Sequence, residues 1–137
     1  VLLLFGVVLV WAGRGGPLPE SRIAWGHDWS AAVQEAAQSD RPILVFATAD
    51  WCPPCRSMKR GPLQRDAVVQ RIAAGFVPVK ADVSDDASPG APIATRFAVQ
   101  YLPTLIVTDA QGDELARVSG YLGDDQLLAW LDEHAPR

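Results

Sequence analysis

The sequence contains few of the residues that build metal centres or covalent scaffolds. Its 137 residues include two cysteines, Cys52 and Cys55, and two histidines. Two cysteines exclude a multi-disulfide scaffold and a four-cysteine zinc site. A mixed zinc site would have to recruit His27 and His134, and haem attachment would need a histidine where Arg56 stands. The cysteine pair is therefore left free for redox chemistry, and we expect no metal.

Positive charge is also scarce. The chain has 12 Lys and Arg against 16 Asp and Glu, for a net charge of -4. Nucleic acid is not expected as the main partner, because phosphate binding requires a clustered excess of Lys and Arg. Hydrophobic residues make up 49% and charged residues 20%, which excludes a disordered chain and favours one folded domain.

The first charged residue is Arg14, and residues 1–13 before it form an apolar run, VLLLFGVVLVWAG. As a helix this run would span about 20 Å, less than the roughly 30 Å of a hydrocarbon core. Because the chain begins at Val1, the run can be the end of a transmembrane anchor, or it can be a signal-peptide apolar region. A buried core helix is the less favoured alternative. Both main interpretations send the rest of the chain across a membrane, so we expect an extracytoplasmic, periplasm-type location, either membrane-anchored or exported, and N-terminal membrane association.

Residues 14–22, RGGPLPESR, have the composition of a linker, and residues 23–137 are predicted to form the folded domain. A domain of this size buries roughly two-thirds of its unfolded surface. It therefore needs neither a disulfide nor a metal for stability.

Hydrophobic periodicity in the domain predicts alternating helices and strands. Helices are predicted over 28–39, with Asp28 as the cap, and over 67–74, with Asp66 as the cap. Three more are predicted: the basic stretch after Cys55, which ends at Gly61-Pro62, the segment 91–97, and a last helix that starts at Asp124 or Asp125. The predicted strands are 43–48, 76–82, 104–109 and 114–120, the last two joined by a hairpin turn. Parallel crossovers in the first half and a hairpin in the second predict an α/β fold with a mixed sheet of about four strands flanked by helices.

Residue spacing also predicts which faces are buried. The apolar face of the first helix should contain Trp29, Val33, Ala36 and Ala37, and that of the last helix Leu127, Leu128 and Leu131. The continuous run ILVFAT, 43–48, is typical of a strand buried on both sides.

The strongest chemical signal is the CPPC sequence that follows this buried strand and opens a helix. Residues three apart at a helix N-terminus share a face, so the two sulfurs can reach bonding distance. Unpaired N–H groups of the first turn and the helix dipole favour a thiolate at Cys52, predicted as the exposed nucleophile. Cys55, one turn further on, is the predicted resolving thiol. Pro53 and Pro54 fit the first turn of a helix, where their missing N–H groups have no intrahelical partners. A purely structural role for the disulfide is less favoured, because the loop it would close is too short to stabilise the fold much.

The sequence TADWCPPC after ILVFA, with YLPT about fifty residues later, resembles the thioredoxin superfamily. Within it, residues 25–134 are similar to the thioredoxin-like domains of membrane-linked thiol:disulfide interchange proteins, including the C-terminal domain of DsbD-like reductases. The resemblance implies a thioredoxin fold, the redox pair Cys52 and Cys55, no organic cofactor, and a cis Leu102–Pro103 bond close to Cys52. The positions it implies for substrate binding or support are Trp51, Pro53, Pro54, Leu102, Pro103 and Thr104.

The chain departs from thioredoxins in the residue that usually accepts the proton of the resolving thiol. Thioredoxins carry a buried Asp six positions before the first Cys, where this chain has Phe46. The family's partner Lys is expected to fall near Pro78, and Lys80 is not expected to be its equivalent. Asp50 is a nearby carboxylate. It can be an ordinary solvated acid of the loop, and this interpretation is at least as well supported as a role as the base that accepts the proton of Cys55.

Basic residues are concentrated after the CPPC sequence: Arg56, Lys59, Arg60, Arg65 and Arg71. They have two interpretations. They can lower the pKa of Cys52 and attract acidic clients, or they can form a solvated face that complements a helix C-terminus.

Together these features predict a thiol:disulfide oxidoreductase that reduces extracytoplasmic disulfides or carries electrons to them. Its expected partners are disulfide-bearing client proteins and, from the resemblance, a membrane electron donor. A thiol oxidase or isomerase would use the same residues, because the sequence does not set a reduction potential. A thioredoxin-fold module that escorts a metal such as copper through its thiols is the third interpretation.

Overall fold

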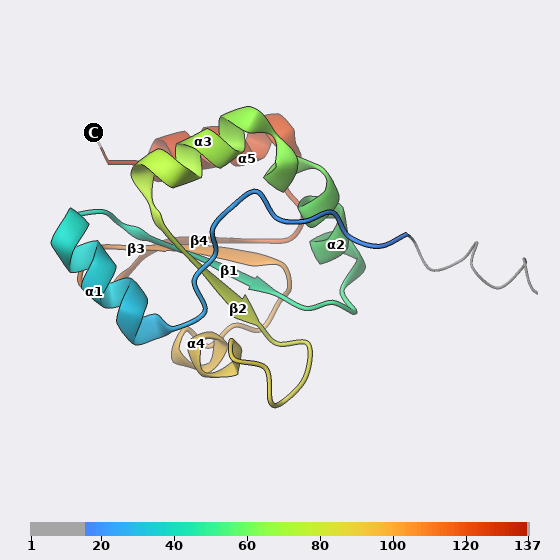
Figure 1. The fold of residues 1–137 in the computed structure, drawn as a ribbon, viewed down its shortest axis with the longest axis horizontal. Helices are drawn as coiled ribbons and strands as arrows, with labels where there is room; N and C mark the ends of the chain where they lie inside the picture. Colours follow the sequence, from blue (N-terminus) through green and yellow to red (C-terminus); the bar gives the residue numbers. More distant parts are fainter. Residues whose placement is uncertain (1–15, 137) are drawn as a thin grey trace, which may run out of the picture.

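The computed structural model describes residues 16–136, which form a four-stranded mixed sheet with helices on both sides (Figure 1). The apolar segment 1–13 and the start of the predicted linker lie outside these residues. The strands are β1 (Ile43–Thr48), β2 (Val77–Asp82), β3 (Thr104–Thr108) and β4 (Glu114–Ser119). The helices are α1 (Trp29–Ser39), α2 (Pro53–Arg60), the short 3₁₀ helix η1 (Pro62–Gln64), α3 (Asp66–Gly75), α4 (Ala91–Arg96) and α5 (Asp124–His134). Within residues 16–136 no helix has both the length and the apolarity to cross a bilayer.

The strand order is β2-β1-β3-β4, with β1 parallel to β2 and antiparallel to β3, and with β3 antiparallel to β4. This arrangement confirms the predicted mixed sheet. All six residues of β1 are buried, as their apolar run predicted. Alternate side chains serve two cores: Leu44 and Phe46 pack with α2, α3 and α5, whereas Ile43 and Val45 pack with α1 and α4. In Figure 1, α3 and α5 accordingly lie on one side of the sheet and α1 and α4 on the other.

Helix α1 confirms its predicted cap and corrects part of its predicted face. The Asp28 carboxylate accepts a hydrogen bond from the N–H of Ala31 at 2.7 Å. Ala32 and Ala36 are buried, but Ala37 is exposed. Ala32 is three residues after Trp29 and four before Ala36, a spacing that places it on the same buried face of the helix.

Two further expectations about helix ends and faces need adjustment. Asp66 is the first residue of α3 rather than its cap, and its carboxylate forms an ion pair with Arg22 at 2.6 Å. In α5, Leu127 and Leu131 are fully buried, whereas Leu128 packs at the edge of the core and is half-buried.

Gly90, the residue before α4, lies against the end of β2. A Cβ atom at this position would fall 1.9 Å from the backbone nitrogen of Asp82 and 2.5 Å from its carbonyl oxygen. Only glycine permits this approach, so the residue fixes how closely α4 packs beside the end of β2.

Candidate active site

The cysteine pair lies where β1 ends and α2 begins. Cys52 is the N-cap of α2, with extended backbone angles, and its Sγ atom accepts a hydrogen bond from the N–H of Cys55 at 3.4 Å. The two residues form a disulfide, with their Cα atoms 5.3 Å apart. Pro53 and Pro54 occupy the first turn, as predicted, where a missing N–H costs no intrahelical hydrogen bond.

Cys52 is more enclosed than the sequence suggested, whereas Cys55 is buried as expected for the residue one turn further into the helix. Cys52 was expected to be exposed, but it is 4% exposed, and Cys55 is 0% exposed. They pack with the buried Ala49 and with the side chains of Val83 and Leu102, from two other segments of the chain. The small remaining exposure nevertheless belongs to Cys52, the predicted nucleophile.

The loop before β3 brings the predicted YLPT residues to the cysteines. The Leu102–Pro103 bond is cis, which confirms the expectation. Pro103 is buried, and its carbonyl accepts a hydrogen bond from the N–H of Gly120 at 2.8 Å. The buried hydroxyl of Thr104 donates to the Tyr101 carbonyl at 2.7 Å. Pro103 and Thr104 therefore brace this loop from inside, while Leu102 contacts the cysteine cluster.

A groove of about 560 Å³ runs beside Cys52. It is flanked by two exposed aromatic side chains, Trp51 at 65% and Tyr101 at 68% exposure. Its lining contains four of the predicted support residues and five that sequence reasoning missed. The predicted ones are Trp51, Pro53, Pro54 and Leu102, and the missed ones are Val83, Ala94, Val99, Gln100 and Tyr101. Only Tyr101 had a usable signal, since it directly precedes the LPT sequence.

The expectation about the partner lysine was wrong. Lys80 lies opposite Phe46 in the parallel β1–β2 register, and Pro78 lies opposite Leu44. The expected position was two residues too early, because the strands of a parallel pair are joined by a long crossover and no hairpin turn fixes their register from the sequence.

Lys80 and Phe46 line a small cavity of about 160 Å³ together with Asp50, Lys59 and Asp82. The Lys59 ammonium lies 3.6 Å from the Asp50 carboxylate, which is otherwise 68% exposed. Burial lowers the pKa of Lys80, and the nearby Lys59 lowers it further, although Asp82 and Asp50 oppose the shift. Asp50 is thus both a solvated loop acid and one member of a cluster of charges beside β1.

Two of the five basic residues after the CPPC sequence form ion pairs with acidic residues of α5. Arg65 pairs with Asp124 at 3.2 Å and with Asp125 at 3.3 Å, and Arg71 pairs with Asp132. These contacts join α3 to α5. They favour the interpretation of a solvated, ion-paired face for this part of the stretch.

The cations nearest the cysteines make different contacts. The Arg56 guanidinium donates to the Asp50 carbonyl at 3.4 Å, and both Arg56 and Arg60 donate to the carbonyl of Gly16. Arg56 and Lys59 are therefore the two basic residues of this stretch that contact Asp50, in the segment before Cys52.

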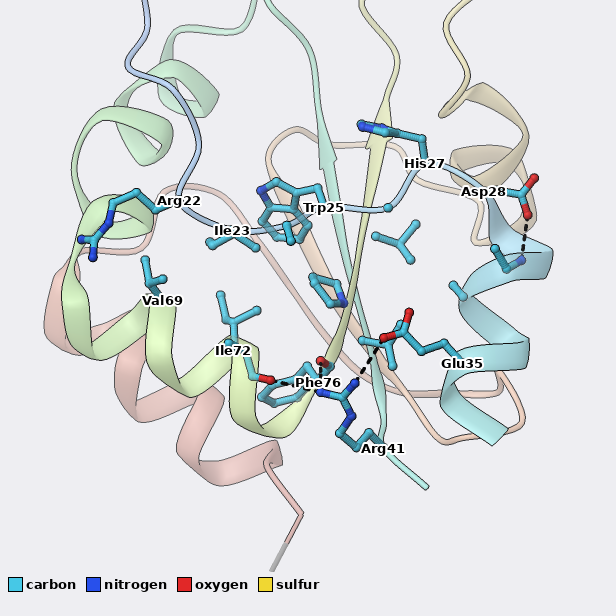
Figure 2. A pocket seen from close by; sticks show the side chains of 18 residues that line it. Arg22, Ile23, Trp25, His27, Asp28, Glu35, Arg41, Val69, Ile72 and Phe76 are labelled. Atoms are coloured by element: carbon cyan, nitrogen blue, oxygen red, sulfur yellow. Dashed lines mark hydrogen bonds and ion pairs between the residues drawn. The ribbon is translucent and has the colours of Figure 1, made fainter. Parts of the chain in front are cut away.

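A second cavity, of about 410 Å³, lies between α1 and α3 and lacks the cysteines (Figure 2). Arg41 crosses it, donating to the carbonyls of Ala73 and Phe76 at 3.1 Å and to Glu35 at 3.2 Å. Two of these bonds satisfy carbonyls at the end of α3 that lack intrahelical partners. His27 is one of the residues that line this cavity. Within residues 16–136 no three His, Cys, Asp or Glu side chains gather as a metal site would require.

Comparison with known proteins identifies the fold and the relatives. The family described as Thioredoxin-like domain matches residues 29–135. The thiol:disulfide interchange protein DsbD of Actinobacillus pleuropneumoniae is 30% identical over 107 residues, which cover 75% of this chain and 18% of that protein. DsbD of Ralstonia nicotianae is 35% identical over 101 residues, covering 73% of this chain and 16% of that protein. The chain therefore spans less than a fifth of either relative.

Solved structures share the fold at lower sequence identity. A thioredoxin from Thermus thermophilus superposes with a TM-score of 0.69 at 23% identity, covering 82% of this chain and 86% of that one. The C-terminal domain of Neisseria meningitidis DsbD, in its reduced form, gives a TM-score of 0.64 at 20% identity, covering 77% and 92%.

Taken with the disulfide at the start of α2, these matches establish a domain with the thioredoxin fold and a disulfide-forming Cys52–Cys55 pair. The chain belongs to the Thioredoxin-like domain family and is homologous to DsbD.

Proposed function

We propose that this domain reduces disulfides in client proteins outside the cytoplasm, using electrons from a membrane-borne dithiol. The observation that carries the proposal is the position of Cys52 as the N-cap of α2, at the edge of an open groove. A thiolate at this position accepts the Cys55 N–H and lies at the positive end of the helix dipole, which stabilises its charge. Homology to DsbD, whose name describes thiol:disulfide interchange, supports the choice of reaction.

The reaction proceeds by two thiol–disulfide exchanges. The Cys52 thiolate attacks one sulfur of a client disulfide, so that the client S–S bond breaks, a Cys52–client bond forms, and one client thiolate leaves. Cys55 then loses its proton and attacks Cys52, which forms the Cys52–Cys55 disulfide and releases the second client thiolate. Two electrons pass to the client, and the two client thiolates take up protons.

The client lies in the groove during these steps. Trp51 and Tyr101 flank it, and Val83 and Leu102 supply apolar surface close to Cys52. This lining suits an extended client segment with apolar side chains next to its cysteine. A second dithiol, on a membrane protein, restores the reduced pair by the same exchange. The apolar segment 1–13 is proposed to keep the domain at that membrane.

Cysteine variants test the assigned roles. Cys52→Ser should abolish disulfide reduction, and Cys55→Ser should accumulate a mixed disulfide that non-reducing electrophoresis detects. Limiting iodoacetamide should label Cys52 before Cys55 in the reduced protein, because Cys55 is fully buried. Preferential labelling of Cys55, or a mixed disulfide trapped by Cys52→Ser instead, would reverse the roles.

The direction of electron flow needs its own measurement. Equilibrating the protein with reduced and oxidised glutathione gives its reduction potential, and a value well above that of glutathione would favour an oxidase or isomerase. Titration of the reduced protein with Cu(I) tests the metal-escort alternative. Tight Cu(I) binding without disulfide reduction would replace the proposed function.

A further inference from the structure

Ser84 contacts the active-site segment through two of its own atoms, although it is far away in the sequence. Its hydroxyl accepts a hydrogen bond from the backbone N–H of Asp50 at 2.9 Å. Its carbonyl accepts a hydrogen bond from the indole Nε1–H of Trp51 at 3.0 Å. These two residues immediately precede Cys52, so Ser84 holds both the backbone and the aromatic side chain that lead into the redox pair.

Ser84 is in turn oriented by Asp82, the last residue of β2. One Asp82 carboxylate oxygen accepts the Ser84 backbone N–H at 2.8 Å and the Ser84 hydroxyl at 2.5 Å. The hydroxyl proton is thereby directed at Asp82, which leaves the hydroxyl oxygen free to accept the N–H of Asp50. The Ser84 hydroxyl therefore makes two hydrogen bonds at once, donating to Asp82 and accepting from Asp50.

The neighbouring residue completes the connection. Val83 donates its N–H to the carbonyl of Thr48 at 2.9 Å, and its side chain packs against the cluster formed by Ala49, Cys52 and Cys55. The start of the loop between β2 and α4 is thus bonded to the segment before α2 at three successive points, Thr48, Asp50 and Trp51.

We propose that Ser84 is a positioning residue for thiol–disulfide exchange: its hydroxyl fixes the backbone before Cys52, and its carbonyl orients Trp51 at the groove. Ser84 does not itself line the groove, so it acts through Trp51 and the cap of α2. The consequence for clients rests on the proposed function, whereas the positioning of Trp51 and Cys52 does not.

The test compares Ser84→Ala with Ser84→Thr, which keeps the hydroxyl, and with Ser88→Ala as a matched control. Ser88 is in the same loop and equally half-buried, but its hydroxyl accepts the N–H of Asp85, away from the redox pair. Three quantities are measured for each variant. They are the rate of insulin disulfide reduction with dithiothreitol as electron donor, the pH profile of Cys52 alkylation by iodoacetamide, and the NMR signal of the Trp51 indole N–H, assigned with Trp51→Phe.

Ser84→Ala should slow insulin reduction about three- to tenfold, the effect of one lost hydrogen bond, and shift the alkylation profile and the Trp51 indole signal. Ser84→Thr should restore all three, and Ser88→Ala should leave them unchanged. Wild-type values in Ser84→Ala, or an equal change in Ser88→Ala, would overturn the proposal. If wild-type protein does not reduce insulin, the proposed function fails, and the alkylation and NMR results still decide the role of Ser84.

Discussion

Lys80 lies directly opposite Phe46 across the parallel β1–β2 pair, and both side chains line the same small cavity. A carboxylate introduced at position 46 would therefore have a cation beside it. Phe46→Asp still removes a fully buried ring that packs 5.4 Å from Trp25, so we expect a loss of about 3–5 kcal/mol in the free energy of unfolding. In a Lys80→Met background the same change should cost about 1–3 kcal/mol more, as measured by urea unfolding in a double-mutant cycle.

The same substitution should also change the kinetics. In thioredoxins, which this chain resembles, an Asp at this position accepts the proton of the resolving thiol, so Phe46→Asp should speed the decay of the mixed disulfide at neutral pH. Phe46→Asn is the control, because an amide cannot accept that proton. If wild type already resolves rapidly, with no pH dependence across neutrality, another base is present. Asp50→Asn is then the next variant to measure.

Stability should depend on pH through Asp82. Burial raises the pKa of this carboxyl, but the hydrogen bonds from Ser84 and the nearby Lys59 and Lys80 more than offset the rise, leaving it below the ordinary value of 3.8. The stabilisation is therefore complete above that value and is lost as the pH falls through the folded-state pKa. The stability difference between wild type and Asp82→Asn, measured by urea unfolding, should be constant from about pH 5 to 7 and shrink below about pH 4. A difference that does not change with pH would contradict this assignment.

Thr48 offers a stabilising substitution. Its side chain is fully buried at the end of β1, and its hydroxyl has no hydrogen-bond partner within residues 16–136. A buried unsatisfied hydroxyl is costly, so Thr48→Val should raise the free energy of unfolding by about 1 kcal/mol. Thr108→Val is the matched control, because the equally buried Thr108 hydroxyl donates to the Asp109 carbonyl at 2.7 Å. The control should lose stability; equal effects in the two variants would show that the Thr48 hydroxyl is satisfied.

Gly90→Ala tests how α4 is held against β2. The added methyl group would overlap the backbone of Asp82, so α4 must shift, at a cost of about 1–3 kcal/mol. Because Ala94 of α4 lines the groove, client reduction should slow as well. Gly123→Ala is the control, since its added Cβ would meet only the Gln126 side chain, at 3.5 Å. A thermal midpoint as high in Gly90→Ala as in wild type would show that the loop relieves the overlap without moving α4.

Local sequence patterns predicted the elements better than they predicted the contacts between them. The apolar run of β1 and the CPPC sequence each specify their own structure, and both were placed correctly. The cis Leu102–Pro103 bond was predictable only from the family resemblance. The position of Lys80 opposite Phe46 and the bond between Ser84 and Asp50 depend on how distant segments pair, which periodicity does not encode. The enclosure of Cys52 likewise results from Val83 and Leu102, which reach it through the tertiary fold.

The N-cap at Cys52 joins the folding of α2 to the oxidation state of the protein. The sulfur that accepts the Cys55 N–H is part of a neutral disulfide in the oxidised protein and is a thiol group that can ionise only once the pair is reduced, so the two states cap the helix unequally. Folding and reduction form a closed thermodynamic cycle. Any free energy by which the cap stabilises the reduced fold over the oxidised fold must appear as an equal shift of the dithiol–disulfide equilibrium. Pro53 and Pro54, which shape that first turn, therefore help to determine how readily the pair accepts electrons, whichever client occupies the groove.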